Sequence, residues 1–381
     1  MSVGTLELLG QTVNPGDAES LSLLSSGGTL YVAVEDNPTA GGGPVESRVY
    51  RWTGSAWDAV GGALNDPAEF DALQPWLFEY DGDLYCALEQ VVEGTGSRSE
   101  VLVRKWNKTA GAWETLGRFR NDETEGDANY PVVAAQGDGF WVAWEEKQGD
   151  GGALRVYARR FDGKSWGSVA RVDEAGAETS ATRPKIAVWN GRVVVCWFEE
   201  TRDTDGRLTA SEARASAWDG ASWAPLGAQP VSPAGTRAAF PWVAATADGT
   251  LWLADQEERA DGTWRIAVRR WSGSEWAEMT GDGLWGDVES EPGGDAREPT
   301  LAVIGETLVM AWHELHAPPA PSEAHLRVGN AGGELSDPAL TVPLPAGTAA
   351  SVAVVAAHGG MPAVGVIDGD HKVWVAVGTA P

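Results

Sequence analysis

The sequence predicts an all-β fold, a seven-bladed β-propeller with four antiparallel strands in each blade. The first observation is a short aromatic hairpin, Arg51-Trp52-Thr53-Gly54-Ser55-Ala56-Trp57, which returns in similar form along the chain. The second is a longer unit of 51 to 58 residues, which occurs seven times. The third is that the last unit lacks its fourth strand, while a matching segment stands at the amino terminus. A propeller closed by its own termini accounts for all three.

The aromatic hairpins are the predicted turns between the third and fourth strands of a blade. Each has a polar turn between two aromatic-ended runs, and its glycine supplies the positive φ that a tight turn needs. The facing aromatic side chains can then pack across the ladder. The further copies are 106–113, 161–166, 218–223 and 271–276.

Each repeat unit opens with a proline, or an equivalent residue, and an apolar run. The chain then turns at a glycine and continues with a second apolar run that ends near an acidic residue. The units begin near residues 21, 75, 131, 184, 241, 299 and 350, and the first and last keep the pattern without the proline. An open solenoid would need polar capping repeats, which are missing at both ends. We therefore expect residues 1–381 to form a single propeller domain.

The two ends of the chain are predicted to share the last blade. The final unit stops after its third strand, 372–377, and residues 6–14 resemble the fourth-strand segment 113–121. An outer strand supplied by residues 3–13 would complete the blade and remove two open sheet edges.

Composition and charge exclude several classes of protein. The chain has 48 glycines and 21 prolines among 381 residues, and no apolar run approaches the eighteen residues of a transmembrane helix. A formal net charge of −27 disfavours nucleic acid and anionic membrane surfaces as partners. When the repeats are aligned on their strand-two glycines, Cys86 and Cys196 occupy different positions in different repeats. We therefore expect two buried thiols and no disulfide or thiol-metal site.

The amino terminus has neither the basic region nor the apolar region of a signal peptide. The compartment stays open: cytoplasmic as the sequence stands, or secreted if a signal peptide was removed. We expect a monomer.

Over essentially its whole length the chain resembles bacterial repeat proteins of the sialidase-like and lectin-like propeller type. The resemblance rests on the scheme of proline, apolar run, glycine, apolar run, Trp-Glu and then Trp-x-Gly-x-x-Trp, as in 131–166. It implies the fold and no particular activity. Asp162-Gly163 and Asp219-Gly220 depart from the Asp-box of sialidases, in which another residue separates aspartate from glycine.

The candidate site lies at one mouth of the central channel. Loops between strands two and three emerge there together with the connections between blades, and variable loops on a rigid scaffold are where binding tends to be placed. These are the long loops 35–46, 91–100, 199–212 and 314–323. Strand one begins at this mouth, and the residues predicted to start it are Ser20, Gln74, Tyr130, Arg183, Phe240, Glu298 and Ala349.

Two further sets of residues are expected near the mouth. Directly after the proline position stand Ser22, Trp76, Val132, Lys185, Trp242, Thr300 and Ser351, and strand two ends at Glu35, Glu89, Glu145, Gln256 and His313. From all three sets, the candidate ligand-binding residues are Gln74, Trp76, Tyr130, Arg183, Lys185, Phe240, Trp242, Glu298, Glu89, Glu145 and His313. Aromatic rings beside charged groups suit a carbohydrate, because a ring covers the apolar face of a sugar while polar groups bind its hydroxyls.

Tryptophans Trp144, Trp197 and Trp312 recur close to the ends of strand two. They have two interpretations, stacking on a sugar or packing between blades. The large area that each ring buries favours packing.

These patterns predict a non-catalytic, lectin-like propeller that binds a glycan. The alternative is a scaffold that binds a protein. A sialidase needs an arginine triad and a tyrosine nucleophile with its carboxylate, whereas only Arg183 occupies a first-strand mouth position. A two-carboxylate glycoside hydrolase stays open as a second alternative, since 55 acidic residues offer many pairs. We assign no catalytic residue.

No cofactor is predicted. Asp203 and Asp205 stand at alternate positions before Gly206, as in calcium loops, but the remaining ligands of such a loop are missing. His313 and His316 lie three residues apart, and we interpret them as parts of a strand end and a solvated loop rather than a metal site.

Overall fold

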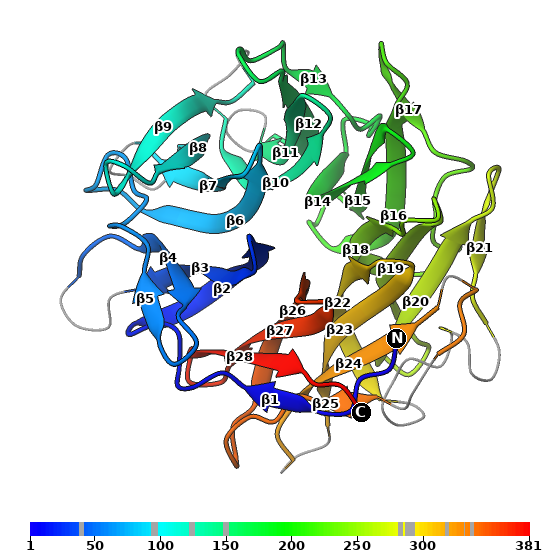
Figure 1. The fold of residues 1–381 in the computed structure, drawn as a ribbon. Helices are drawn as coiled ribbons and strands as arrows, with labels where there is room; N and C mark the ends of the chain where they lie inside the picture. Colours follow the sequence, from blue (N-terminus) through cyan, green and yellow to red (C-terminus); the bar gives the residue numbers. More distant parts are fainter. Residues whose placement is uncertain are drawn as a thin grey trace.

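Seven four-stranded antiparallel sheets surround a central axis (Figure 1), so the predicted fold class is confirmed. The computed structural model describes residues 1–37, 42–92, 98–121, 126–147, 152–280, 285, 294–316, 320–330, 332–335 and 339–381. Parts of three loops expected at the mouth, 35–46, 91–100 and 314–323, lie outside these residues. Within the described ranges, no helix has the length and hydropathy needed to cross a lipid bilayer.

In the first three blades the strands follow chain order, from the channel outward. Blade 1 consists of β2 (Asp17–Ser26), β3 (Thr29–Asn37), β4 (Glu46–Trp52) and β5 (Trp57–Ala59). Blade 2 consists of β6 (Ala72–Tyr80), β7 (Asp83–Val91), β8 (Ser99–Asn107) and β9 (Ala112–Phe119). Blade 3 consists of β10 (Ala128–Gln136), β11 (Gly139–Lys147), β12 (Leu154–Phe161) and β13 (Ala170–Arg171).

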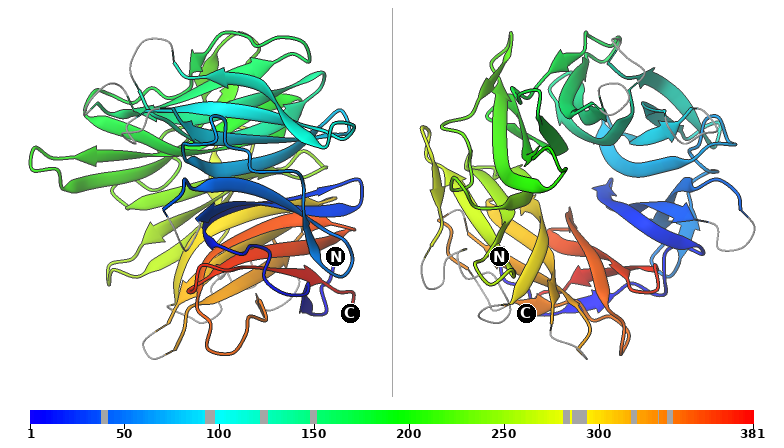
Figure 2. Two further views of the ribbon diagram at one scale, coloured as in Figure 1. Left: turned by 90° about the vertical axis from the view of Figure 1, so that its left-hand side faces the viewer. Right: turned by 180° about the vertical axis from the view of Figure 1, so that it is seen from behind.

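The next three blades repeat this order. Blade 4 consists of β14 (Thr179–Trp189), β15 (Arg192–Arg202), β16 (Leu208–Trp218) and β17 (Trp223–Pro225). Blade 5 consists of β18 (Ala238–Ala245), β19 (Leu251–Glu258), β20 (Trp264–Trp271) and β21 (Trp276–Glu278). Blade 6 consists of β22 (Asp295–Ile304), β23 (Thr307–Leu315), β24 (Glu323–Gly329) and β25 (Leu340–Thr341). Seen edge-on, the β15–β16 hairpin extends beyond its neighbours on one side of the ring (Figure 2, left, green).

The seventh blade contains both ends of the chain, as predicted. Its strands are β26 (Ala350–His358), β27 (Met361–Asp368), β28 (Val373–Gly378) and, on the outside, β1 (Leu6–Leu8). β1 is antiparallel to β28, with Glu7 opposite Val377. The pairing extends on both sides of β1, since Gly4 N donates to Thr379 O at 2.9 Å and Val13 N donates to Val373 O at 2.9 Å.

The repeated aromatic hairpin joins neighbouring blades. Ring centroids of the paired aromatics lie 5.2 to 5.6 Å apart in all five copies. In four copies the second tryptophan also donates its indole N–H to a backbone carbonyl of the preceding blade, at 2.8 to 3.3 Å. The pairs are Trp57 to Leu9, Trp113 to Val60, Trp166 to Leu116 and Trp276 to Leu226. The motif therefore stabilises the ring as well as the turn.

A glycine follows each of these four carbonyls and makes room for the aromatic rings. At Gly61, a Cβ atom would stand 2.6 Å from the ring of Trp106, and φ is +75°. Real Cβ atoms do not approach carbon so closely, so a side chain here must displace the ring.

We expect Gly61→Ala to destabilise the protein by about 2 to 4 kcal/mol, because a steric clash is added to an unfavourable φ. Gly54→Ala is the matched control, since Gly54 has φ +96° and its Cβ would meet no atom within 4 Å. Urea unfolding of the two variants separates the clash from the φ effect. Equal losses of stability would contradict the role given to Gly61.

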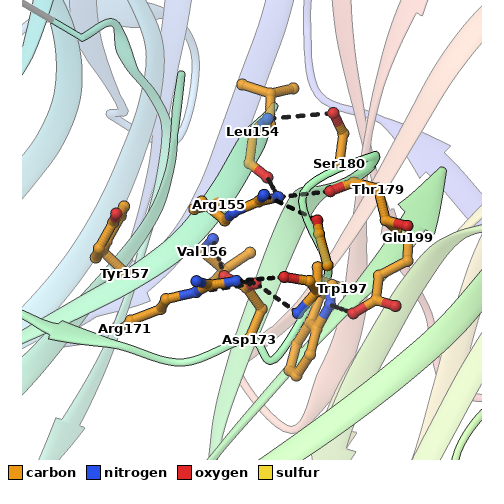
Figure 3. Close-up of polar contacts among 12 residues, drawn as sticks. Leu154, Arg155, Val156, Tyr157, Arg171, Asp173, Thr179, Ser180, Trp197 and Glu199 are labelled. Carbon is orange, nitrogen blue, oxygen red and sulfur yellow. Dashed lines mark hydrogen bonds and ion pairs between the residues drawn. The ribbon is translucent and has the colours of Figure 1, made fainter. Parts of the chain in front are cut away.

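Polar side chains fix the connection between blades 3 and 4 (Figure 3). Arg155, on β12, donates to the carbonyls of Thr179 and Gly176 at 2.5 and 2.9 Å. The buried carboxylate of Asp173 accepts from Val156 N at 2.7 Å and from the Arg171 guanidinium at 2.7 Å. The connecting segment is thus held by charge-assisted hydrogen bonds on both sides.

Cys86 and Cys196 are buried and free, in different blades. Burial raises the pKa of both thiols. They are inert core residues, as their positions in the repeat predict.

Candidate functional site

The central channel contains a cavity of about 660 Å³, formed by the first strands of all seven blades. Its rim is lined by six of the predicted mouth residues, Ser20, Gln74, Tyr130, Arg183, Phe240 and Glu298. The cavity is a concave, partly polar site of the size that binds small ligands or a few sugar units.

Five rim residues share an unusual backbone conformation. Their φ values are 51° to 55°, in the left-handed region that non-glycine residues rarely adopt; they are Gln74, Tyr130, Arg183, Phe240 and Glu298. In each case the residue lies in a β-bulge, directly before a proline. A bulge re-aims a side chain, and sparsely populated conformations cluster at functional sites. The bulges place these five side chains at the channel mouth.

Three of these bulges are held by hydrogen bonds. In each case the acceptor is a residue at the end of strand two in the preceding blade. Glu35 Oε2 accepts from Gln74 N at 3.0 Å, and Gln256 Oε1 accepts from Glu298 N at 2.8 Å. Glu145 Oε2 accepts from Arg183 N and from Thr182 Oγ1, both at 2.5 Å. Glu35, Glu145 and Gln256 therefore position the backbone of the next blade, which satisfies an otherwise unpaired N–H group.

Arg183 and Tyr130 form a stacked pair at the rim. The guanidinium carbon of Arg183 lies 3.7 Å from the ring centroid of Tyr130 and 5.6 Å from that of Phe240. Such cation–π contacts hold the planar guanidinium in place while its N–H groups remain available to a ligand. Burial raises the pKa of Tyr130, an effect that Arg183 partly offsets, so the phenol is protonated at neutral pH.

Below the rim, three side chains from different blades meet across the channel. The rings of Trp76 and Trp242 lie 5.7 Å apart, and Lys185 Nζ stands 5.6 Å and 5.1 Å from their centroids. Trp76 Nε1 also donates to Val133 O at 3.2 Å. Burial lowers the pKa of Lys185 to about 8, and the neighbouring Arg183 adds to this effect. These side chains form a floor for the rim site.

Glu89, near the end of β7, is not among the described residues that line the cavity, but its carboxyl group is strongly perturbed. Burial, together with the charges of Glu35 and Glu145, raises its pKa to about 8. The Asn129 amide, oriented with its nitrogen toward Glu89, donates to Oε1 at 3.1 Å. Glu89 is therefore largely protonated at neutral pH and can donate a proton.

Glu298 lines the cavity on the blade 6 side, whereas His313 is buried in β23 of the same blade and is not among the described residues that line it. Burial raises the pKa of Glu298, while Arg183 and Lys185 act in the opposite direction. Burial lowers the pKa of His313 to about 4, helped by the charge of Arg297, so the imidazole is neutral.

The structure places some predicted residues elsewhere. In the last blade, Val352 and Val354 line the cavity at the positions assigned to Ala349 and Ser351. The sequence alignment was wrong by three residues, because this blade lacks the proline. Gly82 follows Pro75 by seven residues, and counting back seven from Gly360 would have given the correct register.

The tryptophans near the ends of strand two are packing residues. Trp144, Trp197 and Trp312 are at most 3 % exposed, and their indole N–H groups donate to Glu146, Glu199 and Glu314. Of their two interpretations, packing between strands and blades is therefore the correct one.

Asp203, one of the two candidate calcium ligands, forms hydrogen bonds within its own turn. Its Oδ1 atom accepts from the backbone N–H groups of Asp205 and Arg207, both at 2.9 Å. The carboxylate of Asp205 lies 3.8 Å from the guanidinium of Arg207.

No protein-family model matches the sequence, and no curated protein is significantly similar to it. Several solved structures have similar folds at low sequence identity. An ulvan lyase of polysaccharide lyase family PL25, bound to -[GlcA(1-4)Rha3S]-, has a TM-score of 0.66 at 12 % identity, over 98 % of this chain and 96 % of the lyase. The GH93 α-L-arabinofuranosidase of Fusarium graminearum, in complex with arabinobiose, has a TM-score of 0.57 at 14 % identity, over 87 % and 99 %.

A third similar structure is the Hadza microbial sialidase Hz136, with a TM-score of 0.53 at 14 % identity, over 92 % of this chain and 76 % of the sialidase. These likenesses confirm the resemblance to sialidase-like propellers at the level of the fold.

The comparisons correct the prediction of a non-catalytic binding protein. The similar structures are glycoside hydrolases and polysaccharide lyases, which favours the enzyme alternative. The prediction was wrong because it looked for an arginine triad or a carboxylate pair in the sequence. It could not detect a carboxyl group whose pKa is raised by burial, which depends on neighbours from several blades.

Proposed function

We propose that the protein is a glycoside hydrolase that cleaves a polysaccharide at the channel mouth. The observation that carries the proposal is the buried, protonated carboxyl group of Glu89, which interacts electrostatically with Tyr130, a residue that lines the cavity together with Arg183. Glycoside hydrolysis needs a carboxylic acid that keeps its proton at neutral pH, and burial next to other carboxylates is how such an acid is made.

Glu89 is the proposed general acid. Its proton passes to the glycosidic oxygen as the bond between this oxygen and the anomeric carbon breaks. Water then adds its hydroxyl group to the anomeric carbon, and the remaining proton returns to the Glu89 carboxylate. The overall step consumes one water molecule, and the enzyme ends in its original protonation state.

Tyr130 and Arg183 are the proposed binding groups for the sugar next to the cleaved bond. The phenol keeps its proton at neutral pH and donates a hydrogen bond, while the stacked guanidinium offers several donors in a fixed direction. Glu145 acts through Arg183, because it binds the backbone N–H of the bulge that carries this arginine. Glu89, Tyr130 and Arg183 thus act on the substrate from the adjacent blades 2, 3 and 4.

The proposal is tested by incubating the full chain with arabinan, a sialylated glycan and ulvan, and by measuring new reducing ends. With the substrate that is cleaved, Glu89→Gln and Tyr130→Phe should each lower kcat by about 100-fold or more. Glu79→Gln is the control, because Glu79 is exposed near the opposite end of β6. Cleavage that is unchanged in Glu89→Gln would contradict the assigned acid.

A polysaccharide lyase is the second candidate, favoured by the two cationic side chains Arg183 and Lys185 in the cavity of an acidic protein. A lyase must neutralise the carboxylate of a uronic acid, and an arginine suits this task. The same assay separates the two reactions. A lyase leaves an unsaturated uronate that absorbs in the near ultraviolet, whereas a hydrolase produces reducing ends without this absorbance.

The raised pKa of Glu89 also predicts a pH effect on stability. The folded state binds the Glu89 proton more tightly than the unfolded state, so this residue lowers stability as pH rises from about 4.5 to about 8. We expect Glu89→Gln to gain stability over the wild type at pH 9 but not at pH 4. Urea unfolding at both values provides the measurement, and an equal difference at both would contradict the shift.

A further inference from the structure

Three potential metal ligands gather in blade 6, outside the channel cavity. His316 follows β23, while Glu323 and His325 belong to β24. Glu323 Oε2 lies 3.6 Å from His316 Nε2 and 3.6 Å from His325 Nε2, and one ligand atom from each residue falls within 4.8 Å of the others. The ligands of a tetrahedral zinc ion, bound at about 2.0 to 2.1 Å, are about 3.3 to 3.4 Å apart. The two distances from Glu323 are therefore close to the spacing that one ion imposes, and the two imidazole nitrogens lie within 4.8 Å of each other.

The hydrogen bonds of His325 orient it as a metal ligand. The side chain is 2 % exposed, and Nδ1 lies 3.3 Å from Thr341 Oγ1. With the proton on Nδ1, the Nε2 lone pair points toward Glu323 and His316. Metal-binding histidines commonly donate their second N–H to a neighbouring oxygen in this way, which fixes the tautomer and the ring direction.

The nitrogens that face the cluster lack other partners. His316 Nε2 and His325 Nε2 are both buried and have no hydrogen bond among the described residues. The two imidazole rings are nearly perpendicular, at 85°, with centroids 6.4 Å apart. A buried polar atom without a partner costs free energy, and a bound cation would remove this cost at both nitrogens.

We propose that His316, Glu323 and His325 bind a divalent transition-metal ion, with Zn²⁺ as the expected cation. Two imidazoles and one carboxylate are borderline ligands that suit zinc and its neighbours, whereas calcium and magnesium prefer oxygen ligands alone. Glu314 Oε2, 4.0 Å from His325 Nε2, adds negative charge beside the site. Three protein ligands leave one tetrahedral position for water or another ligand.

The site would connect the end of β23 to the start of β24. It occurs at the same end of the blade as the channel mouth, since strands two and three are joined there in every blade. A metal ion would thus fix the blade 6 side of the rim, without contacting the residues assigned to catalysis in blades 2 to 4.

The test uses the full chain, treated with a chelator and then dialysed. Titration with Zn²⁺ in a calorimeter should give one strong site per chain, and a tenfold excess of Ca²⁺ should not compete. His316→Ala and Glu323→Gln should each weaken Zn²⁺ binding at least tenfold. His358→Ala is the matched control, because His358 bonds Ser25 in another part of the ring and should leave zinc binding unchanged.

Binding of Co²⁺ provides a second measurement, since tetrahedral coordination gives intense visible absorption bands that should weaken in Glu323→Gln. Glu323 is 45 % exposed, so this variant should fold even if the histidine variant does not. Melting curves of the variants without metal check their folding. The proposal is overturned if the wild type binds less than about one tenth of an equivalent of Zn²⁺, or if both variants bind it like the wild type.

Discussion

A variant without residues 3–13 should lose about 10 °C of melting temperature or aggregate. Val3, Leu6 and Val13 are each at most 8 % exposed, and burial of such side chains contributes about 1.5 to 3 kcal/mol apiece. For a chain of 381 residues, about 0.8 kcal/mol corresponds to one degree at the transition. The deletion also exposes the edge of β28, a valine-rich strand, to pairing with other molecules.

Two point variants and a peptide sharpen this experiment. Leu6→Asp should reproduce much of the loss with the strand still present, whereas Glu7→Ala should change little, since its side chain is exposed. A synthetic peptide of residues 3–13 added to the truncated protein should raise its melting temperature by adding the missing strand. A truncated protein that stays monomeric and melts like the full chain would contradict the stabilising role of β1.

Replacement of Arg269 by methionine should destabilise the fold by about 3 to 5 kcal/mol. Arg269 is 2 % exposed and forms ion pairs with Asp255 and Glu257, which are equally buried. Removal of the cation takes the ion-pair partner from Asp255 in the core of blade 5, while Glu257 keeps its ion pair with Arg265. Leaving one side of a buried ion pair without its partner is far more costly than losing a surface pair.

The loss in Arg269→Met should also depend on pH. Burial raises the pKa of Asp255 to about 7 even with Arg269 beside it, and without the arginine this pKa rises further. The folded variant then binds a proton that the unfolded chain releases, so its stability falls as pH increases. Urea unfolding should show a larger loss at pH 8 than at pH 5. Arg270→Met, a neighbour on the opposite face of β20, should cost less than 1 kcal/mol at both values.

The fold could be predicted because its signals are local and repeated. The aromatic hairpin fixes a turn within a few residues of sequence, and seven copies of the unit allow one blade to be checked against another. The last blade shows the limit of this reasoning. Without a proline at Ala353, the register had only the glycine turn as an anchor, and the wrong residues were placed at the mouth.

The candidate site was predictable only in its position. A residue before the proline of strand one could be assigned to the mouth. Its left-handed bulge could not be inferred, because a following proline favours an extended conformation with negative φ in the residue before it. The roles of Glu35 and Glu145 depend on contacts with the next blade. His316, Glu323 and His325 were not grouped, because Glu323 and His325 are separated from His316 by a loop and no spacing rule links them.

The sharing of one blade by both ends also has a consequence during synthesis. Thr5 and Thr379, whose hydroxyls lie 2.8 Å apart in the folded protein, are separated by 374 residues. At about 5 to 20 residues per second, a ribosome needs roughly 20 to 75 s to pass from one to the other. Throughout that time β1 has no partner, so it stays unpaired while the strands between it and β28 are made, and the nascent ring must stay open and protected from neighbouring chains until β28 has emerged.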